Sequence, residues 1–280
     1  MSQDRAQTIL QQWRESALYW EKYAGLIRLM FAPITDAMVE ASRIAEGQSV
    51  LDIAGGTGEP SLSFAEILRP AGFVTFTDAI AGMVAAAARE ARRRRVTNID
   101  FSQCLADALP FPSDSFDVVV SRLGVMLFSD PYAATREMLR VVKPNGRVTL
   151  AVWAPAAANP FFKVVTDVIS RYIWPTPEDP DAPGAFRFAE PGKLARLVRE
   201  AGATEVAERL VDFTLEAPLT PKQFWQARAE LSDTLRAKVA QLSPEQLTQV
   251  AQEVEEAGRP FFADGRMRFP AQVLIVTARK

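Results

Sequence analysis

The sequence predicts an α/β protein built on a doubly wound, mostly parallel sheet. Short apolar segments alternate with amphipathic, helix-forming segments between residues 49 and 153, and this alternation favours parallel strands joined by crossover helices. One of the apolar segments, Phe116–Ser121, is almost continuously apolar, as expected of a strand that is covered on both faces. A glycine-rich turn follows the first predicted strand directly, and in open sheets of this class ligands bind beyond the carboxyl ends of the strands.

The predicted elements follow from the spacing of apolar residues and from the turn residues between them. Two helices come first, Gln7–Tyr23 and Pro33–Arg43, with Pro33 expected in the first turn of the second helix. The strands of the alternating region are Ser49–Ile53, Phe73–Thr77, Ile99–Gln103, Phe116–Ser121 and Arg147–Trp153. The helices between them are Ser61–Leu68, Met83–Arg94 and Tyr132–Val142, and the last of these should end at the turn Lys143-Pro144-Asn145-Gly146.

The alternation stops after Trp153. A helix at Pro160–Tyr172 precedes a loop that is rich in proline and aromatic residues, and a helix at Lys193–Ala201 ends at Gly202, a suitable C-terminal cap. The remaining predicted elements are an extended segment at Thr204–Glu216, a helical insert at Pro221–Ala257 and a last strand at Gln272–Ala278. The sequence does not decide whether the insert forms a lid or the surface of a homodimer.

Composition excludes several classes of function. The chain has 280 residues, 48% of them hydrophobic, and a formal net charge of −2, which indicates a globular protein without the basic surface that nucleic acid requires. No apolar run approaches the roughly 20 residues of a membrane span, and the polar N-terminus lacks the apolar core of a signal peptide. A cytoplasmic location is therefore the default expectation.

The absence of histidine removes many mechanisms at once. Without His, the chain cannot use an imidazole base, a Ser-His-Asp triad or a His-ligated metal. Cys104 is the only cysteine, so an internal disulfide and a multi-cysteine metal site are also excluded. We therefore expect no metal centre.

The glycine-rich turn lies in the segment Val50-Leu51-Asp52-Ile53-Ala54-Gly55-Gly56-Thr57-Gly58-Glu59. Small residues at 54–58 let the backbone approach a ligand closely. The segment has neither the G-x-G-x-x-G spacing of a dinucleotide site nor the lysine of a P-loop, and Asp52 at the strand end disfavours a phosphate. A positively charged ligand without phosphate, such as S-adenosylmethionine, suits the turn better. The alternative is a tight strand-to-helix turn that binds no ligand.

Residues 48–153 resemble the class I S-adenosylmethionine-dependent methyltransferases, especially the group of ubiquinone and menaquinone biosynthesis C-methyltransferases. The resemblance is carried by the order and spacing of these segments: Val50–Gly58, Thr77-Asp78, Leu109-Pro110-Phe111-Pro112, Ser115-Phe116-Asp117 and Met138–Arg147. It implies a Rossmann-like, seven-stranded sheet with an antiparallel final strand, a helical cap, S-adenosylmethionine as cofactor and a small-molecule substrate.

The resemblance also implies a division of the chain. Residues 1–45 would form N-terminal helices that are part of a lid, and residues 46–153 the cofactor-binding core. Residues 154–280 would complete the core, with a lid loop at 154–190 and the helical insert at 221–257.

The resemblance further implies roles for individual residues. The backbone of Ala54, Gly55, Gly56 and Gly58 would hold the methionine part of the cofactor, and Asp52 would orient its ammonium group directly or through water. Asp78 would accept both ribose hydroxyls, and Met83 would pack on the adenine. The other expected cofactor-binding residues are Ala79, Leu105, Ala106, Asp107 and Ser121. Two local alternatives stay open, because Asp78 could instead cap the helix that follows and Met83 could be an ordinary core residue.

The chain departs from the family pattern at two positions. The aspartate with which the family contacts adenine falls on Leu105, although the backbone of Ala106 could still contact the ring. Ala54 stands in place of the first glycine of the loop. These changes leave room for an altered affinity, or for a protein that holds the cofactor without using it.

Methyl transfer itself requires mainly the alignment of the acceptor with the sulfonium. Without histidine, any general base would be Asp, Glu, Tyr or Lys, unless the acceptor is already acidic, as a phenol or a hydroquinone is. The expected substrate-binding residues are Trp20, Tyr23, Arg122 and Phe162. The aromatic residues could instead attach the cap to the core, and Arg122 could simply pair with Asp117 or Glu137.

The sequence therefore predicts an S-adenosylmethionine-dependent methyltransferase that methylates carbon or oxygen of a small, aromatic or lipophilic molecule. Two alternatives use the same fold. One is an enzyme that catalyses a cyclisation or rearrangement without methyl transfer, and the other is a protein that senses the cofactor. Consumption of the cofactor distinguishes the methyltransferase from both.

Overall fold

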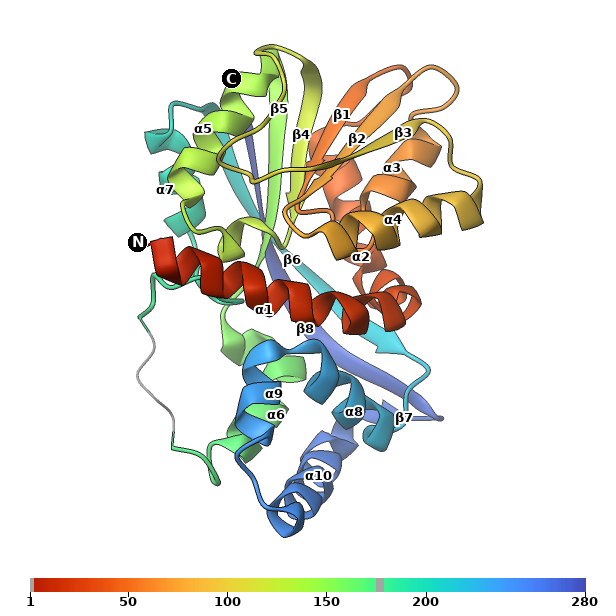
Figure 1. The fold of residues 1–280 in the computed structure, drawn as a ribbon, viewed down its shortest axis with the longest axis vertical. Coiled ribbons are helices and arrows are strands. Elements are labelled where there is room, and N and C mark those ends of the chain that lie inside the picture. Colours follow the sequence, from red (N-terminus) through yellow and green to blue (C-terminus); the bar gives the residue numbers. More distant parts are fainter. Residues whose placement is uncertain (1–2, 175–178) are drawn as a thin grey trace.

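The computed structural model describes residues 3–174 and 179–280, and one mixed sheet forms its centre (Figure 1). Seven strands follow the order β3-β2-β1-β4-β5-β8-β6, and the short β7 pairs with β8 beside them. Strands β1 to β5 pair in parallel, whereas β8 is antiparallel to both β5 and β6. The strands are β1 (Ser49–Ile53), β2 (Phe73–Asp78), β3 (Ile99–Gln103), β4 (Phe116–Arg122), β5 (Val142–Trp153), β6 (Thr204–Ala217), β7 (Phe262–Ala263) and β8 (Arg266–Arg279). The predicted fold class is confirmed, including the antiparallel last strand.

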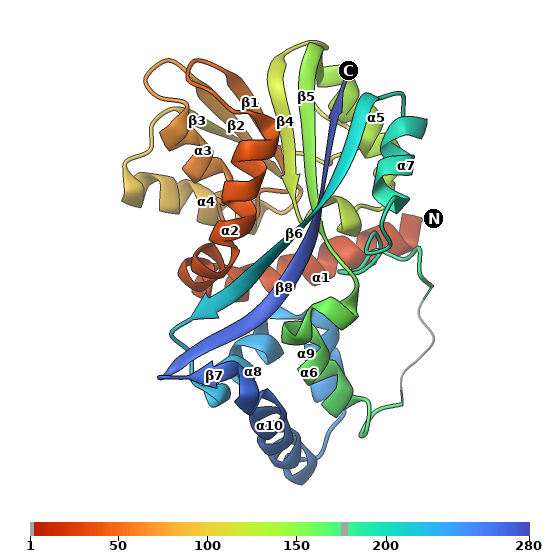
Figure 2. The ribbon, with the colours of Figure 1, turned by 180° about the vertical axis from the view of Figure 1, so that it is seen from behind.

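Helices cover both faces of the sheet. Helix α2 crosses one face, where it contacts β4, β5, β6 and β8 (Figure 2), and α5 and α7 pack against the other (Figure 1). The helices that follow strands of the core are α3 (Ser61–Ile67), α4 (Ala81–Arg94), α5 (Pro131–Val141), α6 (Pro160–Ile169) and α7 (Lys193–Glu200), with short 3-10 turns η1 (Val125–Leu127), η2 (Ala156–Ala158) and η3 (Arg259–Phe261). The central strands are fully buried between these layers, which explains their continuous apolar sequence.

The N-terminal region consists of α1 (Gln3–Lys22) and α2 (Ala24–Ser42). The prediction that Pro33 lies in a first helical turn is wrong, because Pro33 lies inside α2. A proline there removes one backbone hydrogen bond. The apolar face of α2, with Ile34 and Met38 fully buried against the core, offsets that loss through packing.

The predicted turn at 143–146 is part of strand β5 instead. The register between β4 and β5 shifts between Phe116 and Val118, and Asn145 adopts a positive φ of 61°. Lys143 Nζ donates to Asp117 Oδ1 over 2.8 Å. The turn-forming residues therefore produce an irregularity at the start of the strand rather than a separate connection.

A helical cap is joined to the core through the long strands β6 and β8 (Figures 1 and 2). The predicted helical insert at 221–257 consists of three helices separated by short breaks, α8 (Pro221–Leu231), α9 (Asp233–Val239) and α10 (Pro244–Gly258). Phe269 of β8 is fully buried, and its ring centroid lies 5.1 Å from that of Phe224 in α8. The predicted lid loop at 154–190 includes residues 175–178, which lie outside the described residues.

The described helices include none that is both long and apolar enough to cross a membrane.

Candidate functional site

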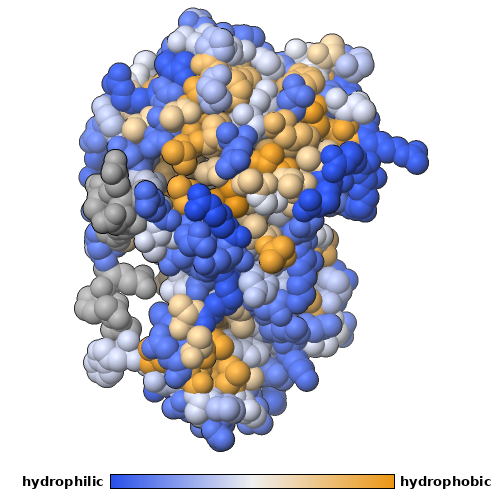
Figure 3. Space-filling view, viewed as in Figure 1, coloured by the Kyte–Doolittle hydropathy of each residue, from blue (hydrophilic) through white to orange (hydrophobic). Residues whose placement is uncertain are grey.

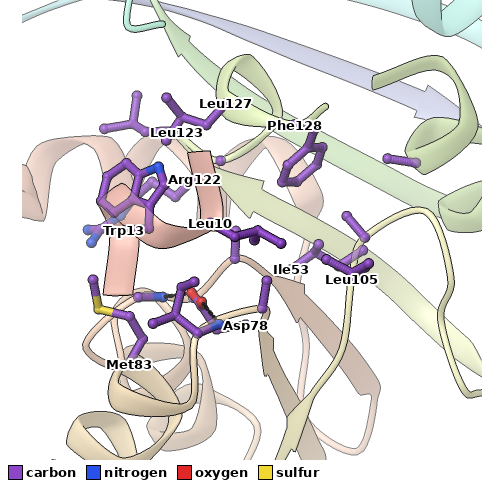
Figure 4. Close-up of a pocket in the computed structure, with 18 of the residues that line it drawn as sticks. Leu10, Trp13, Ile53, Asp78, Met83, Leu105, Arg122, Leu123, Leu127 and Phe128 are labelled. Atoms are coloured by element: carbon purple, nitrogen blue, oxygen red, sulfur yellow. Dashed lines mark hydrogen bonds between the residues drawn. The ribbon is translucent and has the colours of Figure 1, made fainter. Parts of the chain in front are cut away.

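A cavity of about 240 Å³ lies at the carboxyl ends of the parallel strands, beneath helix α1 (Figure 4). Ile53 of β1, Asp78 of β2 and Arg122 of β4 bring the strand ends into its wall. Leu10 and Trp13 of α1 face these strand ends from the opposite side (Figure 4). Figure 3 shows hydrophobic surface gathered over the core above the hydrophilic stripe of α1. The site is thus placed where an open α/β sheet binds its ligands.

The loop after β1 presents its backbone to this cavity. Gly56 has a φ of +60°, and a Cβ placed on it would meet nothing within 4 Å, so its open side leaves room for a ligand. Gly55 is required for packing, because a Cβ there would lie 2.3 Å from the ring of Phe76 and 2.9 Å from Asp52 Oδ2. Ala54 has a φ of 59°, a left-handed conformation that favours glycine. The first loop position therefore keeps the backbone shape of a glycine.

Two further glycines, Gly58 and Gly124, let neighbouring residues pack closely beside the loop. Gly58, which was expected to bind the cofactor, is not in the cavity wall. It is needed for packing instead, because a Cβ on it would lie 2.9 Å from Leu62 Cδ1 and 3.5 Å from Ala87 Cα. Gly124 does line the cavity, and a Cβ on it would lie 2.7 Å from Ala54 Cβ and 2.6 Å from Ser121 Oγ. The sequence analysis missed Gly124, which has no motif of its own and whose only signal is its place just after β4.

The carboxylate of Asp78 connects the loop to helix α4. Its Oδ2 accepts a hydrogen bond from the Gly56 N–H over 3.0 Å, and its Oδ1 accepts one from the Ile80 N–H over 2.9 Å. Ile80, not Asp78, is the N-cap residue of α4, although the carboxylate does satisfy an N–H at the helix start. Burial raises the pKa of Asp78 to about 6 despite these hydrogen bonds.

Asp52 lies beneath the loop and does not line the cavity. It is fully buried, and its Oδ2 accepts a hydrogen bond from Ser61 Oγ over 2.6 Å. Within the described part of the chain, its Oδ1 has no hydrogen-bond partner, and neither has the buried Ser121 Oγ. Burial raises the pKa of Asp52 to about 7. A buried carboxylate oxygen without a donor among the residues described therefore lies directly beneath the loop that lines the cavity.

Of the other expected cofactor-binding residues, Ala79, Met83, Leu105, Ala106 and Asp107 line the cavity, whereas Ser121 does not. Met83 is also buried in a small apolar cluster with Ala17 of α1 and Ile80, so its side chain belongs both to packing and to the cavity wall. Leu105 is 46% exposed, so part of its side chain is open to solvent at the cavity wall.

Only two of the four expected substrate-binding residues, Trp20 and Arg122, line the cavity. Trp20 lines the cavity, and its Nε1 donates to the Leu231 carbonyl of α8 over 3.2 Å. Tyr23 and Phe162 do not line it. Lys22 Nζ lies over the Tyr23 ring, and Phe162 packs 5.0 Å from Trp153. Phe162 therefore packs against strand β5, and Tyr23 lies next to Lys22, which binds Glu230 of α8.

Arg122 lines the cavity and is held by helix α2 and by the loop after β1. Its Nη1 donates to Thr35 Oγ1 of α2 over 2.8 Å, and its Nη2 donates to the Glu59 carbonyl over 2.9 Å. Its guanidinium carbon lies 5.6 Å from the centroid of Phe31, a further lining residue. Burial lowers the pKa of Arg122.

The alternative that Arg122 pairs with Asp117 or Glu137 is wrong. Asp117 binds Lys143 and Glu137 binds Arg140 instead. Arg122 therefore contributes a positive charge to the cavity wall that no direct ion pair among the described residues neutralises.

Comparison with known proteins agrees with this geometry. A sequence model of the ubiE/COQ5 methyltransferase family matches residues 33–177, more than half of the chain. The chain belongs to the ubiE/COQ5 methyltransferase family. The predicted family and its cofactor, S-adenosylmethionine, are confirmed by this match.

Among curated relatives, the ubiquinone/menaquinone biosynthesis C-methyltransferase UbiE of Xanthomonas oryzae is 37% identical over 138 residues, which are 49% of this chain and 54% of that protein. The chain thus spans about half the length of the curated relatives it matches. A putative methyltransferase from Bacillus halodurans superimposes with a TM-score of 0.58 at 18% identity, covering 88% of this chain and 98% of that one. The [4+2]-cyclase SpnF superimposes with a TM-score of 0.52 at 23% identity, covering 88% of this chain and 80% of that one. At these identities the solved structures establish the fold alone.

The left-handed conformation of Ala54 predicts that Ala54→Gly stabilises the protein. An alanine with positive φ is strained, whereas glycine adopts that conformation freely, so the free energy of unfolding should rise by about 1 kcal/mol. Ala85→Gly, in the exposed middle of α4, is the matched control and should lower it by about 1 kcal/mol. Urea unfolding measures both changes. A destabilised Ala54→Gly variant would contradict the backbone geometry of the loop.

The buried carboxylate of Asp52 predicts a specific pH dependence of stability. Its folded pKa of about 7 lies above the ordinary value of 3.8, so the folded state binds the proton more tightly and the contribution to stability falls as pH rises from about 4 to about 7. Asp52→Asn should therefore gain about 2–3 kcal/mol relative to wild type between pH 5 and pH 8.

Urea unfolding at those two pH values tests this expectation. Asp78 also lowers the free energy of unfolding as pH rises, but it does so equally in wild type and in Asp52→Asn, so the difference between them reports on Asp52. Asp100→Asn, which removes an exposed carboxylate, should retain the wild-type pH slope. Equal slopes for wild type and Asp52→Asn would show that Asp52 titrates normally in the folded protein.

Proposed function

We propose that the cavity beneath α1 binds S-adenosylmethionine and that the chain transfers its methyl group to a small aromatic or lipophilic acceptor. The observation that carries the proposal is Asp78, a buried carboxylate at the cavity edge held by the N–H groups of Gly56 and Ile80. A carboxylate fixed in this way is suited to accept hydrogen bonds from a pair of hydroxyls, such as those of a ribose.

The other residues of the site support the same ligand. The open side of Gly56 leaves room for the aminoacyl part, and the unpartnered Asp52 Oδ1 beneath the loop is an acceptor suited to an ammonium group, directly or through water. Met83 and Ala79 offer an apolar surface for the adenine, with the backbone of Ala106 beside them. Leu105 provides no carboxylate there, so recognition of the adenine amino group would depend on the backbone or on Asp107.

When bound, the cofactor supplies an activated methyl group on a sulfonium, and the protein has to align the acceptor and exclude water. Leu10 and Trp13 of α1 cover the cavity, and Phe31, Leu127 and Phe128 extend its apolar wall. Such a wall favours a flat or lipophilic acceptor. Because the chain has no histidine, an acceptor that ionises readily, such as a phenol or a hydroquinone, suits the site best.

Two other functions on this fold are distinguished by the fate of the cofactor. A cyclisation or rearrangement enzyme and a cofactor sensor would both bind S-adenosylmethionine without converting it to S-adenosylhomocysteine. The membership of this chain in a methyltransferase family favours methyl transfer.

The binding test compares S-adenosylmethionine, S-adenosylhomocysteine and NAD by calorimetry. Wild type should bind the first two and not NAD. Asp78→Asn should weaken binding about 10- to 100-fold at pH 8, since charge-assisted hydrogen bonds contribute about 1.5–3 kcal/mol. Because the pKa of Asp78 is about 6 and that of Asp52 about 7, the wild-type affinity should fall as pH decreases from 8 to 5. The fall should be smaller for Asp78→Asn, in which only Asp52 still titrates.

Asp100→Asn is the control for loss of charge alone and should bind like wild type. Transfer of a labelled methyl group from S-adenosylmethionine to phenols and quinols then tests catalysis. Absence of cofactor binding at both pH values would contradict the proposal, and binding without cofactor consumption over a broad acceptor screen would favour the cyclase or the sensor.

A further inference from the structure

Arg228 of α8 is a cation in an aromatic environment away from the cofactor cavity. Its guanidinium carbon lies 4.8 Å from the ring centroid of Phe161 and 4.8 Å from that of Phe162. Its Nε is buried, while the residue as a whole keeps partial exposure. The guanidinium carbon thus lies close to two rings whose planes are 83° apart, and part of the residue remains exposed to solvent.

The charge of Arg228 is not matched by any anion in the described ranges, 3–174 and 179–280. Its Nε is buried without a hydrogen-bond partner, and no ion pair involves its guanidinium. By contrast, Arg171 binds Glu253 over 3.0 Å, and the guanidinium of Arg236 donates a hydrogen bond to the neutral Ser16 Oγ over 2.6 Å. Burial lowers the pKa of Arg228 to about 10. An unpaired cation in such surroundings is costly, so an anion that reaches it would be bound favourably.

A continuous set of aromatic contacts connects Arg228 to the cavity. Phe31 lines the cavity and lies 5.6 Å from Trp153, which lies 5.0 Å from Phe162, one of the two rings under Arg228. On the other side, the lining residue Trp20 donates to the Leu231 carbonyl at the end of the helix that carries Arg228. The guanidinium therefore lies where the cap meets the core, beyond the apolar wall of the cavity.

We propose that Arg228, whose guanidinium lies beside Phe161 and Phe162, binds an anionic group of the methyl acceptor, which is then an amphipathic acid. The planar guanidinium binds a carboxylate or a phosphate through two parallel hydrogen bonds, and the rings suit the apolar body attached to it. This inference rests on the proposed function, because it assigns a substrate class to the same enzyme. Arg228 acts as a specificity-determining residue and takes no part in cofactor binding.

The test uses two fluorescent dyes of the same skeleton, one with a sulfonate and one without: 1-anilinonaphthalene-8-sulfonate and N-phenyl-1-naphthylamine. With and without saturating S-adenosylhomocysteine, wild type should bind the sulfonate at least tenfold more tightly than the neutral dye. In Arg228→Gln the preference should fall below twofold, and in Arg228→Lys, which keeps the charge but not the planar fork, part of it should remain. Arg171→Gln removes an exposed, paired cation from the adjoining helix end and should keep the full preference.

Affinity for S-adenosylhomocysteine and the melting temperature verify that each variant is folded. The affinity should match wild type, and the melting temperature should not fall. Displacement of the bound sulfonate by 1-naphthoate or by 1-naphthyl phosphate then distinguishes a carboxylate from a phosphate ligand. Equal binding of both dyes to wild type, a preference that persists in Arg228→Gln, or displacement by neither acid would overturn the inference. A wild type that shows the preference but binds no S-adenosylhomocysteine would instead overturn the proposed function alone.

Discussion

The hydrogen bonds of the Asp78 carboxylate hold the site together. They join the Gly56 N–H of the loop after β1 to the Ile80 N–H at the start of α4, so two segments that follow different strands share one anchor. The neighbouring strands β1 and β2 run in parallel register, which brings their carboxyl ends together. The shape of the cavity, the open side of Gly56 and the position of Met83 all depend on this connection.

Charge distribution around the cavity follows from burial. Asp52 and Asp78 are both buried carboxylates with raised pKa values, and their ionised forms therefore destabilise the protein without a ligand. Arg122 offsets part of that cost for Asp52 through its charge, although its own hydrogen bonds go to Thr35 and to backbone carbonyls. A ligand with an ammonium and a sulfonium would supply the positive charge that these carboxylates lack. In the cap the signs are reversed, because Arg228 is a cation that pairs with no carboxylate among the described residues.

Most of the core could be predicted from local sequence, because strand composition, glycine turns and crossover helices are encoded within short segments. The cavity could be predicted only in part. The loop glycines and Asp78 adjoin a recognisable strand end, whereas Phe31 and Gly124 reach the cavity from segments without a motif, through the crossing of α2 and the turn after β4. Phe162 and Tyr23 were expected in the site, but aromatic residues also attach a cap, and sequence alone does not separate the two roles. Pro33 is a further example. Its local preference for a first helical turn predicted a helix that begins there, but tertiary packing keeps it inside the longer helix α2.

A crystal structure of the protein with S-adenosylhomocysteine tests the central claim most directly. The account predicts density for the ligand in the cavity beneath α1, with the ribose hydroxyls on the Asp78 carboxylate, the adenine against Met83 and the aminoacyl part along Gly56. Ligand density elsewhere on the molecule, or a ribose that does not contact Asp78, would contradict it.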